Sequence, residues 1–438
     1  MITEEQNRLL TQVGPGTAMG GMMRRFWLPV CTSAQLPKPD GPPLHVRLLG
    51  ENFVAFRTSN GEVGMLDEYC MHRRASLVLG RVEDNGIRCL YHGWKFGVDG
   101  TVQETPNHCD GRFKASIRAP AYPVREAGGL VWAYIGPKEL EPPFQPYAFF
   151  EGADANRCIF RINIPANYLQ LYEGGTDSSH VGILHCNLAN PDWKDKASFV
   201  PEASDYSSVA MAVGDNAPDI DLENTEYGFH YAARREGPAL DDGTPTDSVR
   251  VTAVILPTGR IIPLAQYQFF IFEVPQDDFK TSTFIVSYGP KPFDRAKMRV
   301  VLGLNNEKLW TEHDSEYLAT PENRFGQDVS RMSETWSGLE GLVPEDASIG
   351  VSMGPIVERH KEMLVAADSA VVRLRNRLLD SLKLYAAGKD PLGLSIKDYS
   401  KVRSLADTNI AKGKRWQELL PDNLGISQAI KTPELANP

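Results

Sequence analysis

The chain has 438 residues, of which 42% are hydrophobic and 23% charged, and its formal net charge is −10 at pH 7. These values suit a folded protein of two or three domains and exclude a chain-long coiled coil, collagen or disorder. Acidic character without basic runs excludes a typical nucleic-acid binder. The sequence contains no run of 18 apolar residues, the length that would indicate a membrane span. Residues 1–5 are polar and acidic, unlike a signal peptide, and six cysteines do not make a disulfide framework, so we expect a cytoplasmic protein.

The first third of the chain predicts one short helix followed by a small all-β domain. Residues 3–12 favour a helix, because Thr3 is a suitable N-cap and Glu4 and Glu5 fall in its first turn. Short apolar runs separated by Gly and Asn turns then predict strands at 45–49, 53–56, 63–66 and 129–135. Residues from about 40 to 137 therefore form the predicted β domain.

The remainder of the chain predicts an α+β region. Three prolines between residues 138 and 147 indicate a linker or a domain edge. Beyond them, residues 165–186 have helical spacing, strands are expected at 249–256, 266–274 and 281–288, and residues 367–387 form an amphipathic helix. That helix carries Arg373, Arg375 and Arg377, for which we expect a solvated or inter-subunit face.

Two short segments combine cysteine and histidine at metal-ligand spacing. Cys70-x-His72 is followed, after sixteen residues, by Cys89-x-x-His92. A zinc finger would pair its ligands by type, whereas each segment here offers one thiolate and one imidazole. Such mixed pairs can place both cysteines on one iron and both histidines on the other, which is the Rieske [2Fe–2S] arrangement. A zinc ribbon is the alternative.

This segment resembles the Rieske domain of the Rieske non-haem iron oxygenases, including Trp94 two residues after the last histidine. Oxygen chemistry also needs a second metal with open coordination positions, such as a site of two histidines and one carboxylate. His180 and His185 are five residues apart, so on a regular helix their rings would diverge by about 140°, and we expect a bend near Gly182 to bring them together. The family's D-x-x-H-x₄-H motif matches Asp177, His180 and His185, and the resemblance implies that the histidines bind iron and that Asp177 is the bridging acid.

The third iron ligand should be a carboxylate in the last third of the chain. The stretch around Glu345-Asp346, ahead of Ser352-Met353-Gly354-Pro355, resembles the phthalate dioxygenase-like subfamily, in which an aspartate at this place completes the triad. The resemblance points to Asp346, with Glu345 second and Asp368 third. The alternative is that Glu345 and Asp346 only cap a helix.

Several other residues are candidates for weaker reasons. Arg250 is our preferred anchor for a substrate carboxylate, with Arg234 and Arg235 as alternatives, because a guanidinium pairs with a carboxylate at two points. His230 alternates with aromatic residues at strand spacing and is expected to line the pocket. The remaining cysteines, including Cys109 beside His108, are expected to be packed rather than metal-bound. No arginine lies between Arg161 and Arg234, so the arginine pair that phthalate dioxygenase itself uses looks incomplete.

The resemblance implies an α+β fold in three parts. Residues 1–39 would be an N-terminal helical segment packing on the catalytic domain, residues 40–145 the all-β Rieske domain, and residues 146–438 a catalytic domain with an antiparallel sheet and helices. Its cofactors would be the [2Fe–2S] cluster, a mononuclear Fe(II) and O₂ as co-substrate. Family members are homotrimers of this subunit alone, in which an electron passes from the cluster of one protomer, through its second histidine, to the bridging aspartate of the next; here these are His92 and Asp177.

The implied function is the terminal oxygenase of a multicomponent system, supplied with electrons by a separate NAD(P)H-dependent reductase, with or without a ferredoxin domain. We expect it to monooxygenate or O-demethylate an aromatic carboxylate. A cis-dihydroxylating dioxygenase of a phthalate-like acid is the first alternative, and a Rieske electron carrier without an oxygenase site or a zinc regulatory module are others. The sequence leaves open the particular substrate, the reductase and any stacking of trimers into hexamers.

Overall fold

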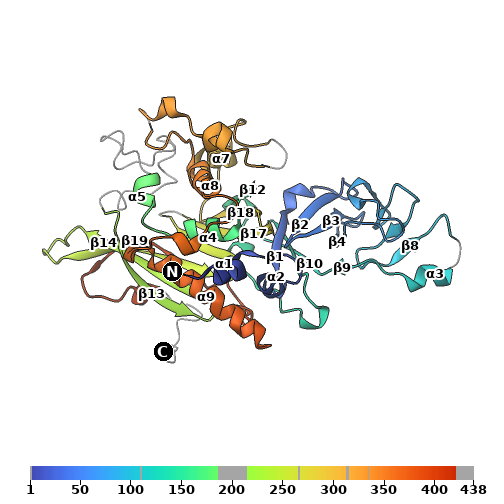
Figure 1. The fold of residues 1–438 in the computed structure, drawn as a ribbon, viewed down its shortest axis with the longest axis horizontal. Helices are drawn as coiled ribbons and strands as arrows, with labels where there is room; N and C mark the ends of the chain where they lie inside the picture. The colour runs from blue at the N-terminus through green and yellow to red at the C-terminus, as the bar shows by residue number, and fades with distance from the viewer. Residues whose placement is uncertain are drawn as a thin grey trace.

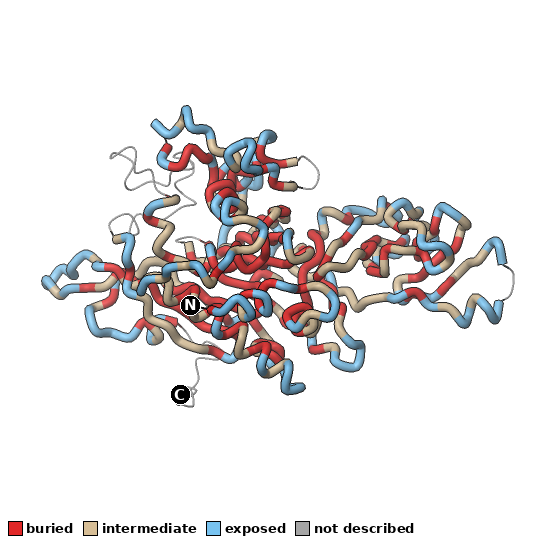
Figure 2. Tube along the Cα trace, in the orientation of Figure 1, coloured by how far each residue is buried: buried red, intermediate tan, exposed pale blue. Residues whose placement is uncertain are grey.

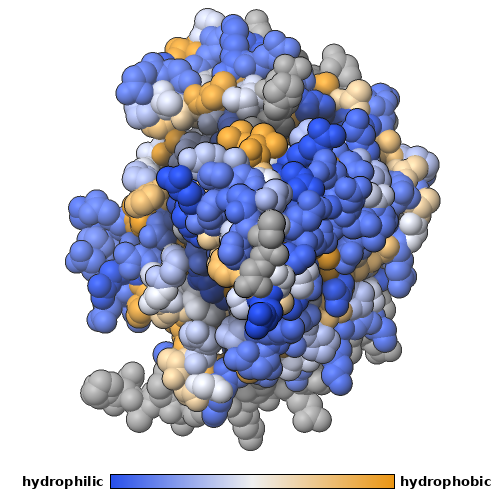
Figure 3. Space-filling model, turned by 90° about the vertical axis from the view of Figure 1, so that its right-hand side faces the viewer, coloured by the Kyte–Doolittle hydropathy of each residue, from blue (hydrophilic) through white to orange (hydrophobic). Residues whose placement is uncertain are grey.

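The computed structural model describes residues 2–108, 111–185, 215–264, 267–311, 315–333 and 335–420. A small β-rich lobe lies at one end of the long axis, and a larger lobe of sheet and helices occupies the other (Figure 1). Buried segments run through the centre of both lobes (Figure 2). Viewed from the small lobe, the surface is mostly hydrophilic with separate hydrophobic patches (Figure 3). Within the described ranges, no helix has the length and apolar character needed to cross a bilayer.

The N-terminal segment joins the two lobes. Helix α1 (Glu4–Thr11) begins with the predicted Thr3 cap, which forms a capping box with Gln6, and α2 (Ala18–Met23) follows. Helix α1 contacts helices of the large lobe, whereas β1 (Leu28–Thr32) pairs with β11 (Leu130–Ala133), which also pairs with β10 (Val124–Ala127). Segment 1–39 therefore holds a strand as well as helices, and the proposed division at residues 39 and 145 stays a prediction.

The small lobe consists of two four-stranded antiparallel sheets that enclose an apolar core. The first sheet has the order β2 (Leu44–Leu48), β3 (Glu51–Arg57), β4 (Val63–Asp67) and β9 (Ala121–Tyr122). The second has the order β5 (Arg81–Glu83), β6 (Gly86–Arg88), β7 (Lys95–Phe96) and β8 (Val102–Glu104), and α3 (Gly111–Ser116) follows it. The strands predicted at 45–49, 53–56 and 63–66 are confirmed as β2, β3 and β4, because short apolar runs bounded by turns form them.

The large lobe is built on an eight-stranded antiparallel sheet. Seven of its strands follow the order β12 (Arg157–Ile164), β18 (Lys280–Tyr288), β17 (Gln268–Asp277), β16 (Gly259–Pro263), β15 (Thr246–Ile255), β14 (Gly228–Gly237) and β13 (Asp219–Thr225). The eighth, β19 (Leu405–Ala411), pairs with β15. The strands predicted at 249–256 and 281–288 are confirmed as β15 and β18. The run predicted from residue 266 corresponds to β17, although residue 266 itself lies outside the described ranges.

Helices pack against this sheet and place the candidate site. They are α4 (Tyr168–Gly174), α5 (Val181–Leu184), α7 (Arg295–Val301), α8 (Leu342–Ser352) and α9 (Ser369–Ala386). Helix α4 contacts both β17 and α8, and the Gln170 side-chain amide donates to the Gly350 carbonyl at 2.9 Å. This contact fixes the spacing between the two helices that flank the site.

The predicted helix over 165–186 is wrong in its middle. The chain instead forms α4 and the single-turn α5, separated by a turn in which the Asp177 carboxylate accepts from the Ser179 amide at 2.8 Å. The bend expected near Gly182 is also wrong, because Gly182 lies inside α5. His180 and His185 instead lie at the two ends of helix α5, as its N-cap and C-cap residues.

The arginine row on α9 does not form a solvated face as a whole. Arg375 is buried and pairs with Glu173 at 2.6 Å, and Arg377 is buried and donates to the carbonyl of Thr225 at 2.7 Å. That expectation is wrong for both residues. Their long side chains reach across the helix to satisfy buried acceptors, which helical spacing alone does not reveal.

Candidate metal centres and active-site cavity

Two tight turns carry the cysteine and histidine pairs of the small lobe. Cys70 and Cys89 are buried, and the centroids of the His72 and His92 rings are 4.5 Å apart. In the second turn, the Cys89 amide donates to the Trp94 carbonyl at 2.8 Å and the Gly93 amide donates to the Cys89 carbonyl at 3.0 Å. Gly93 has φ +75°, a conformation that favours glycine, so the turn that presents Cys89 and His92 depends on it.

The chemistry of these four residues fits a [2Fe–2S] cluster. The His72 Nδ1 is buried and has no hydrogen-bond partner in the described residues, so a partner other than protein would satisfy it. Burial raises the pKa of the Cys70 thiol to about 11, so a bound metal is what would hold it as a thiolate. The His72 ring also stacks on Trp94, with centroids 4.8 Å apart, which fixes its plane.

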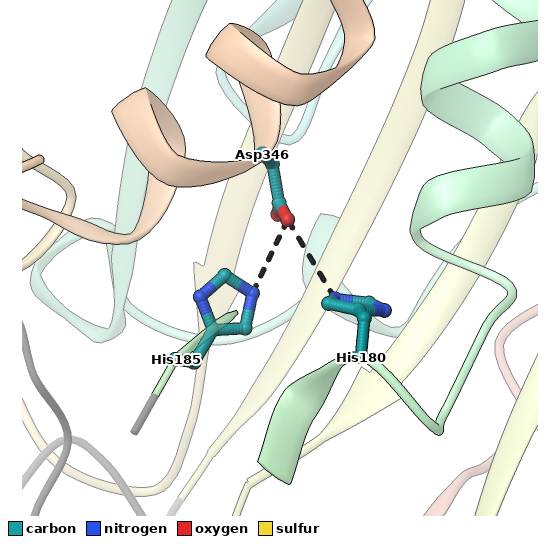
Figure 4. A group of neighbouring side chains, drawn as sticks. All are labelled: His180, His185 and Asp346. Carbon is teal, nitrogen blue, oxygen red and sulfur yellow. Dashed lines mark ion pairs between the residues drawn. The ribbon is translucent and has the colours of Figure 1, made fainter. Parts of the chain in front are cut away.

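His180, His185 and Asp346 converge in the large lobe, and their candidate ligand atoms lie within 4.8 Å of one another. The Asp346 Oδ1 is 3.2 Å from the His185 Nε2 and 3.6 Å from the His180 Nε2 (Figure 4). Asp346 projects from α8 toward the two rings, and its side chain remains 45% exposed because it faces a cavity. Two imidazoles and one carboxylate are the donor set of the facial triad of Fe(II) oxygenases.

Each histidine also contacts a carboxylate of its own through Nδ1, the ring nitrogen that faces away from Asp346. The His180 Nδ1 is 3.1 Å from the Asp177 Oδ2, and the His185 Nδ1 is 2.8 Å from the Glu345 Oε2. These contacts leave both Nε2 atoms directed toward Asp346. Carboxylates placed in this way set the tautomer and orientation of metal-binding histidines.

The electrostatics follow from these contacts. Burial would raise the pKa of the Asp177 carboxyl, but hydrogen bonds from His180 and Ser179 lower that pKa to about 2. Burial would lower the pKa of His185, but the carboxylates of Asp346 and Glu345 raise it to about 10. The site therefore carries concentrated negative charge that favours a bound cation.

The three candidate carboxylates have distinct places. Asp346 faces the histidine Nε2 atoms, whereas Glu345 is fully buried and accepts a hydrogen bond from the Ser337 hydroxyl at 2.8 Å. Asp368 lies at the start of α9 and accepts from the Val365 amide at 2.7 Å. Both Glu345 and Asp346 lie inside α8, whose N-cap is Gly341, so neither is merely a helix cap.

A cavity of about 330 Å³ lies between the sheet and helices α4 and α8, and a smaller one of about 100 Å³ adjoins it. His180 and Asp346 line both cavities. The rest of the lining is largely apolar because alternate residues of β12, β16, β17 and β18 face it, among them Ile164, Ile262, Phe269 and Ile285. The triad thus opens onto space suited to an apolar or aromatic molecule.

The predicted substrate residues fall in different places. Arg250 lines the smaller cavity, and its Nη2 donates to the Pro263 carbonyl at 3.1 Å. Arg234 pairs with Asp247 at 2.6 Å, and Arg235 donates to the Ser178 carbonyl at 3.0 Å, so both alternatives are engaged elsewhere. His230 is fully buried, and its Nε2 is 3.0 Å from the Tyr227 hydroxyl. It does not belong to the described lining of either cavity.

One residue of the cavity wall escaped sequence prediction. Arg260 on β16 is only 6% exposed and lines both cavities. Its signal in the sequence is a single charged residue between a Pro-Thr-Gly turn and Ile261-Ile262, but a strand can place such a charge on either face. Cys109 and Cys186 lie outside the described residues, and the exposed His108 packs its ring against Phe113, with centroids 4.5 Å apart.

Family models match both lobes. A model of the Rieske [2Fe–2S] domain matches residues 26–122, and a model of the LigXa C-terminal domain-like family matches residues 133–432. Together with the triad, these matches define a Rieske-type oxygenase that uses a [2Fe–2S] cluster, mononuclear iron and O₂. The chain belongs to the Rieske non-haem iron oxygenases, in the phthalate dioxygenase-like group.

Curated relatives span most of the chain. It is 37% identical to the phthalate 4,5-dioxygenase oxygenase subunit of Pseudomonas putida, covering 91% of this chain and 90% of the relative. It is also 37% identical to the 5,5'-dehydrodivanillate O-demethylase oxygenase subunit of a Sphingobium species, covering 89% and 83%. Identity is 42% to the tert-butanol monooxygenase / tert-amyl alcohol desaturase oxygenase subunit of Aquincola tertiaricarbonis, covering 88% and 77%.

Solved structures support the fold. Dicamba monooxygenase bound to dicamba aligns with a TM-score of 0.56 and 18% identity over 83% of this chain and 98% of that chain. The expected α+β fold, with an N-terminal Rieske β domain and an antiparallel catalytic sheet, is therefore confirmed, as is the oxygenase function at the level of the family.

Proposed function

We propose that this oxygenase subunit monooxygenates or O-demethylates an aromatic carboxylate, with electrons from a separate NAD(P)H-dependent reductase. The observation that carries the proposal is that the His180, His185 and Asp346 side chains open onto an apolar cavity that also holds Arg250. An apolar wall suits an aromatic ring, and a guanidinium suits the ring's carboxylate. Within the described residues, no carboxylate forms an ion pair with Arg250, so its charge is available to a substrate.

In this proposal Cys70, His72, Cys89 and His92 hold the cluster, and His180, His185 and Asp346 hold the iron. When bound, the cluster supplies single electrons and the iron supplies O₂ activation. The chain's own side chains then have positioning roles. Asp177 and Glu345 hold the two histidine rings through their Nδ1 atoms, and the apolar wall excludes water from the reacting ring.

The proposed electron route runs between subunits of a homotrimer, from His92 of one protomer to Asp177 of the next. Two features support it. The small lobe and α5 lie toward opposite ends of the long axis (Figure 1), so they are far apart within one chain. Apolar side chains in and after the cluster turns are also exposed, and a neighbouring surface would cover them, since Leu90 in the second turn is 66% and Leu79, seven residues after His72, is 72% exposed.

The relatives catalyse different reactions, so the reaction type of this chain is decided by a direct test. The relatives reported above are a dioxygenase, an O-demethylase and a monooxygenase of a tertiary alcohol. We favour monooxygenation or O-demethylation because Arg234 and Arg235 are engaged away from the cavity and Arg260, which shares the smaller cavity with Arg250, is already paired with Glu273. Arg250 therefore lacks the second unpaired arginine that we expect for a vicinal diacid.

The test is a single-turnover reaction of the chemically reduced, iron-loaded protein under ¹⁸O₂ with a panel of methoxylated, hydroxylated and dicarboxylated benzoates and, for comparison, a tertiary alcohol. Product mass spectrometry should find loss of a methyl group or one labelled hydroxyl on a monocarboxylate. Two labelled hydroxyls on a dicarboxylate would establish the dioxygenase alternative. Turnover of a tertiary alcohol but no benzoate would overturn the proposed substrate class.

A further inference from the structure

The wall between the two cavities contains a charged pair inside otherwise apolar surroundings. The Arg260 Nη2 donates to the Glu273 Oε1 at 2.7 Å, and the other oxygen of Glu273 accepts from the Thr283 hydroxyl. All three residues are buried, and all three line the larger cavity. Because Glu273 neutralises the guanidinium, the pair as a whole is a dipole rather than a free positive charge.

The Arg260 guanidinium has donors to spare. Its Nε and Nη1 are shielded from solvent and make no hydrogen bond within the described residues. Buried donors without a partner are rare because they lose hydration and gain nothing in return. Both atoms are covered by protein, so a substrate oxygen in the cavity would reach them only after a small shift of the arginine side chain, and the new hydrogen bond would then satisfy a buried donor.

The neighbouring loop is shaped around this side chain. A Cβ atom added to Gly175 would lie 2.0 Å from the Arg260 Nε, and Gly175 has φ −73°, so space rather than backbone conformation requires the glycine. Gly175 lies two residues before Asp177, on the loop that leads to His180. The guanidinium is thus held between the sheet and the iron-site loop.

We propose that Arg260 is a specificity-determining residue that donates a hydrogen bond to an uncharged acceptor oxygen of the substrate, such as an ether, hydroxyl or carbonyl oxygen. The inference rests on the proposed function in that the same ring would place its carboxylate at Arg250. The two arginines then differ in role. Arg250, which lacks a carboxylate partner in the described residues, takes the anionic group, and Arg260, already paired with Glu273, takes the neutral one.

The test measures binding rather than turnover, by calorimetric titration of the iron-loaded protein without O₂. The probes are the three methoxybenzoic acids and the corresponding ethylbenzoic acids, in which a methylene replaces the ether oxygen at similar size. We expect the wild type to bind at least one methoxy isomer about tenfold or more tightly than its ethyl counterpart. Arg260→Met should abolish this preference.

Two further variants keep the test interpretable. Arg260→Met leaves Glu273 buried without its partner, so Arg260→Met combined with Glu273→Gln provides a neutral version, with its fold checked by the visible cluster spectrum. Arg250→Met should weaken binding of all the acids while leaving the methoxy-over-ethyl preference intact. Equal loss of every acid in the Arg260 variants, with no change in preference, would overturn the assignment.

A neutral pair, methoxybenzene and ethylbenzene, separates this inference from the proposed substrate class. If no benzoate binds but methoxybenzene is preferred in the wild type and not in the Arg260 variants, Arg260 has its proposed role and the carboxylate substrate is wrong. If the wild type distinguishes neither the acid pairs nor the neutral pair, the role of Arg260 is overturned.

Discussion

The His185 Nδ1 lies 2.8 Å from the Oε2 of Glu345, while its Nε2 lies 3.2 Å from the Oδ1 of the next residue, Asp346. Two adjacent carboxylates of one helix therefore contact opposite nitrogens of one imidazole ring. This arrangement gives them different roles, although they are neighbours in the sequence. In the proposed iron site Asp346 is the ligand, and Glu345 is the residue that orients the ring.

The two carboxylates should respond differently to substitution. Asp346→Ala removes one of three ligands and should leave the protein without mononuclear iron. Glu345→Gln keeps an acceptor oxygen for the ring but loses its charge, so the affinity for Fe(II) should fall by roughly ten- to a hundredfold. Metal titration of the two variants measures this, with Glu340→Gln as a control in the same region. If Asp346→Ala bound iron fully and Glu345→Gln bound no iron, Glu345 would be the ligand and Asp346 the orienting residue.

Arg250→Met should impair recognition of acidic substrates. Loss of a charge-assisted contact in a desolvated pocket costs on the order of 2–4 kcal/mol, so KM for the preferred benzoate should rise by well over tenfold. Arg234→Met is the matched control, because Arg234 pairs with Asp247 and does not belong to the described cavity lining. An unchanged KM for every acid in the panel would remove Arg250 from the site.

His230 predicts a pH dependence of stability. Its complete burial lowers the pKa of the ring from 6.5 to about 4. Between pH 6.5 and pH 4 the unfolded chain therefore binds a proton at His230 that the folded chain does not bind. The free energy of unfolding decreases as the pH falls through this window. The loss should approach about 3 kcal/mol by pH 4.

Denaturant unfolding from pH 7 to pH 4.5 should show this loss, and His230→Phe should flatten the acid side of the profile. The variant should also be less stable at pH 7, because the Tyr227 hydroxyl loses its partner. Parallel profiles for the wild type and the variant would show that His230 does not cause the acid sensitivity.

Sequence patterns predicted much of this molecule. The cysteine and histidine pairs at residues 70–92 and the triad residues follow from local spacing and family resemblance, and the small-lobe strands follow from short apolar runs between Gly and Asn turns. Contacts between distant segments were not predictable in the same way. The buried pairing of Arg375 with Glu173 and the place of Arg260 beside Glu273 depend on which face of a helix or strand meets its neighbour. Nor did helical spacing show that the Asp177 turn interrupts the helix, since a side-chain hydrogen bond makes that break.

The proposed route between subunits predicts complementation. Cys70→Ser should lack the cluster but keep the iron, and His180→Ala should keep the cluster but lack the iron, so each protein alone should be inactive. Co-expressed and assembled together, they should recover part of the wild-type turnover, because an intact cluster can then face an intact iron across an interface. Mixed assemblies confirmed by native mass spectrometry but no more active than either parent would contradict the route.

The most direct test of the central claim, that one chain holds both a Rieske cluster and a separate mononuclear iron, is iron and sulfide analysis alongside the visible spectrum. The wild type should contain three irons per chain, two in the cluster and one at the triad. His180→Ala should contain two with an unchanged spectrum, and Cys89→Ala should lose the cluster spectrum, whereas Cys158→Ala, a change at another buried cysteine, should resemble the wild type. A wild-type protein with only two irons, or with zinc and no visible spectrum, would contradict the account.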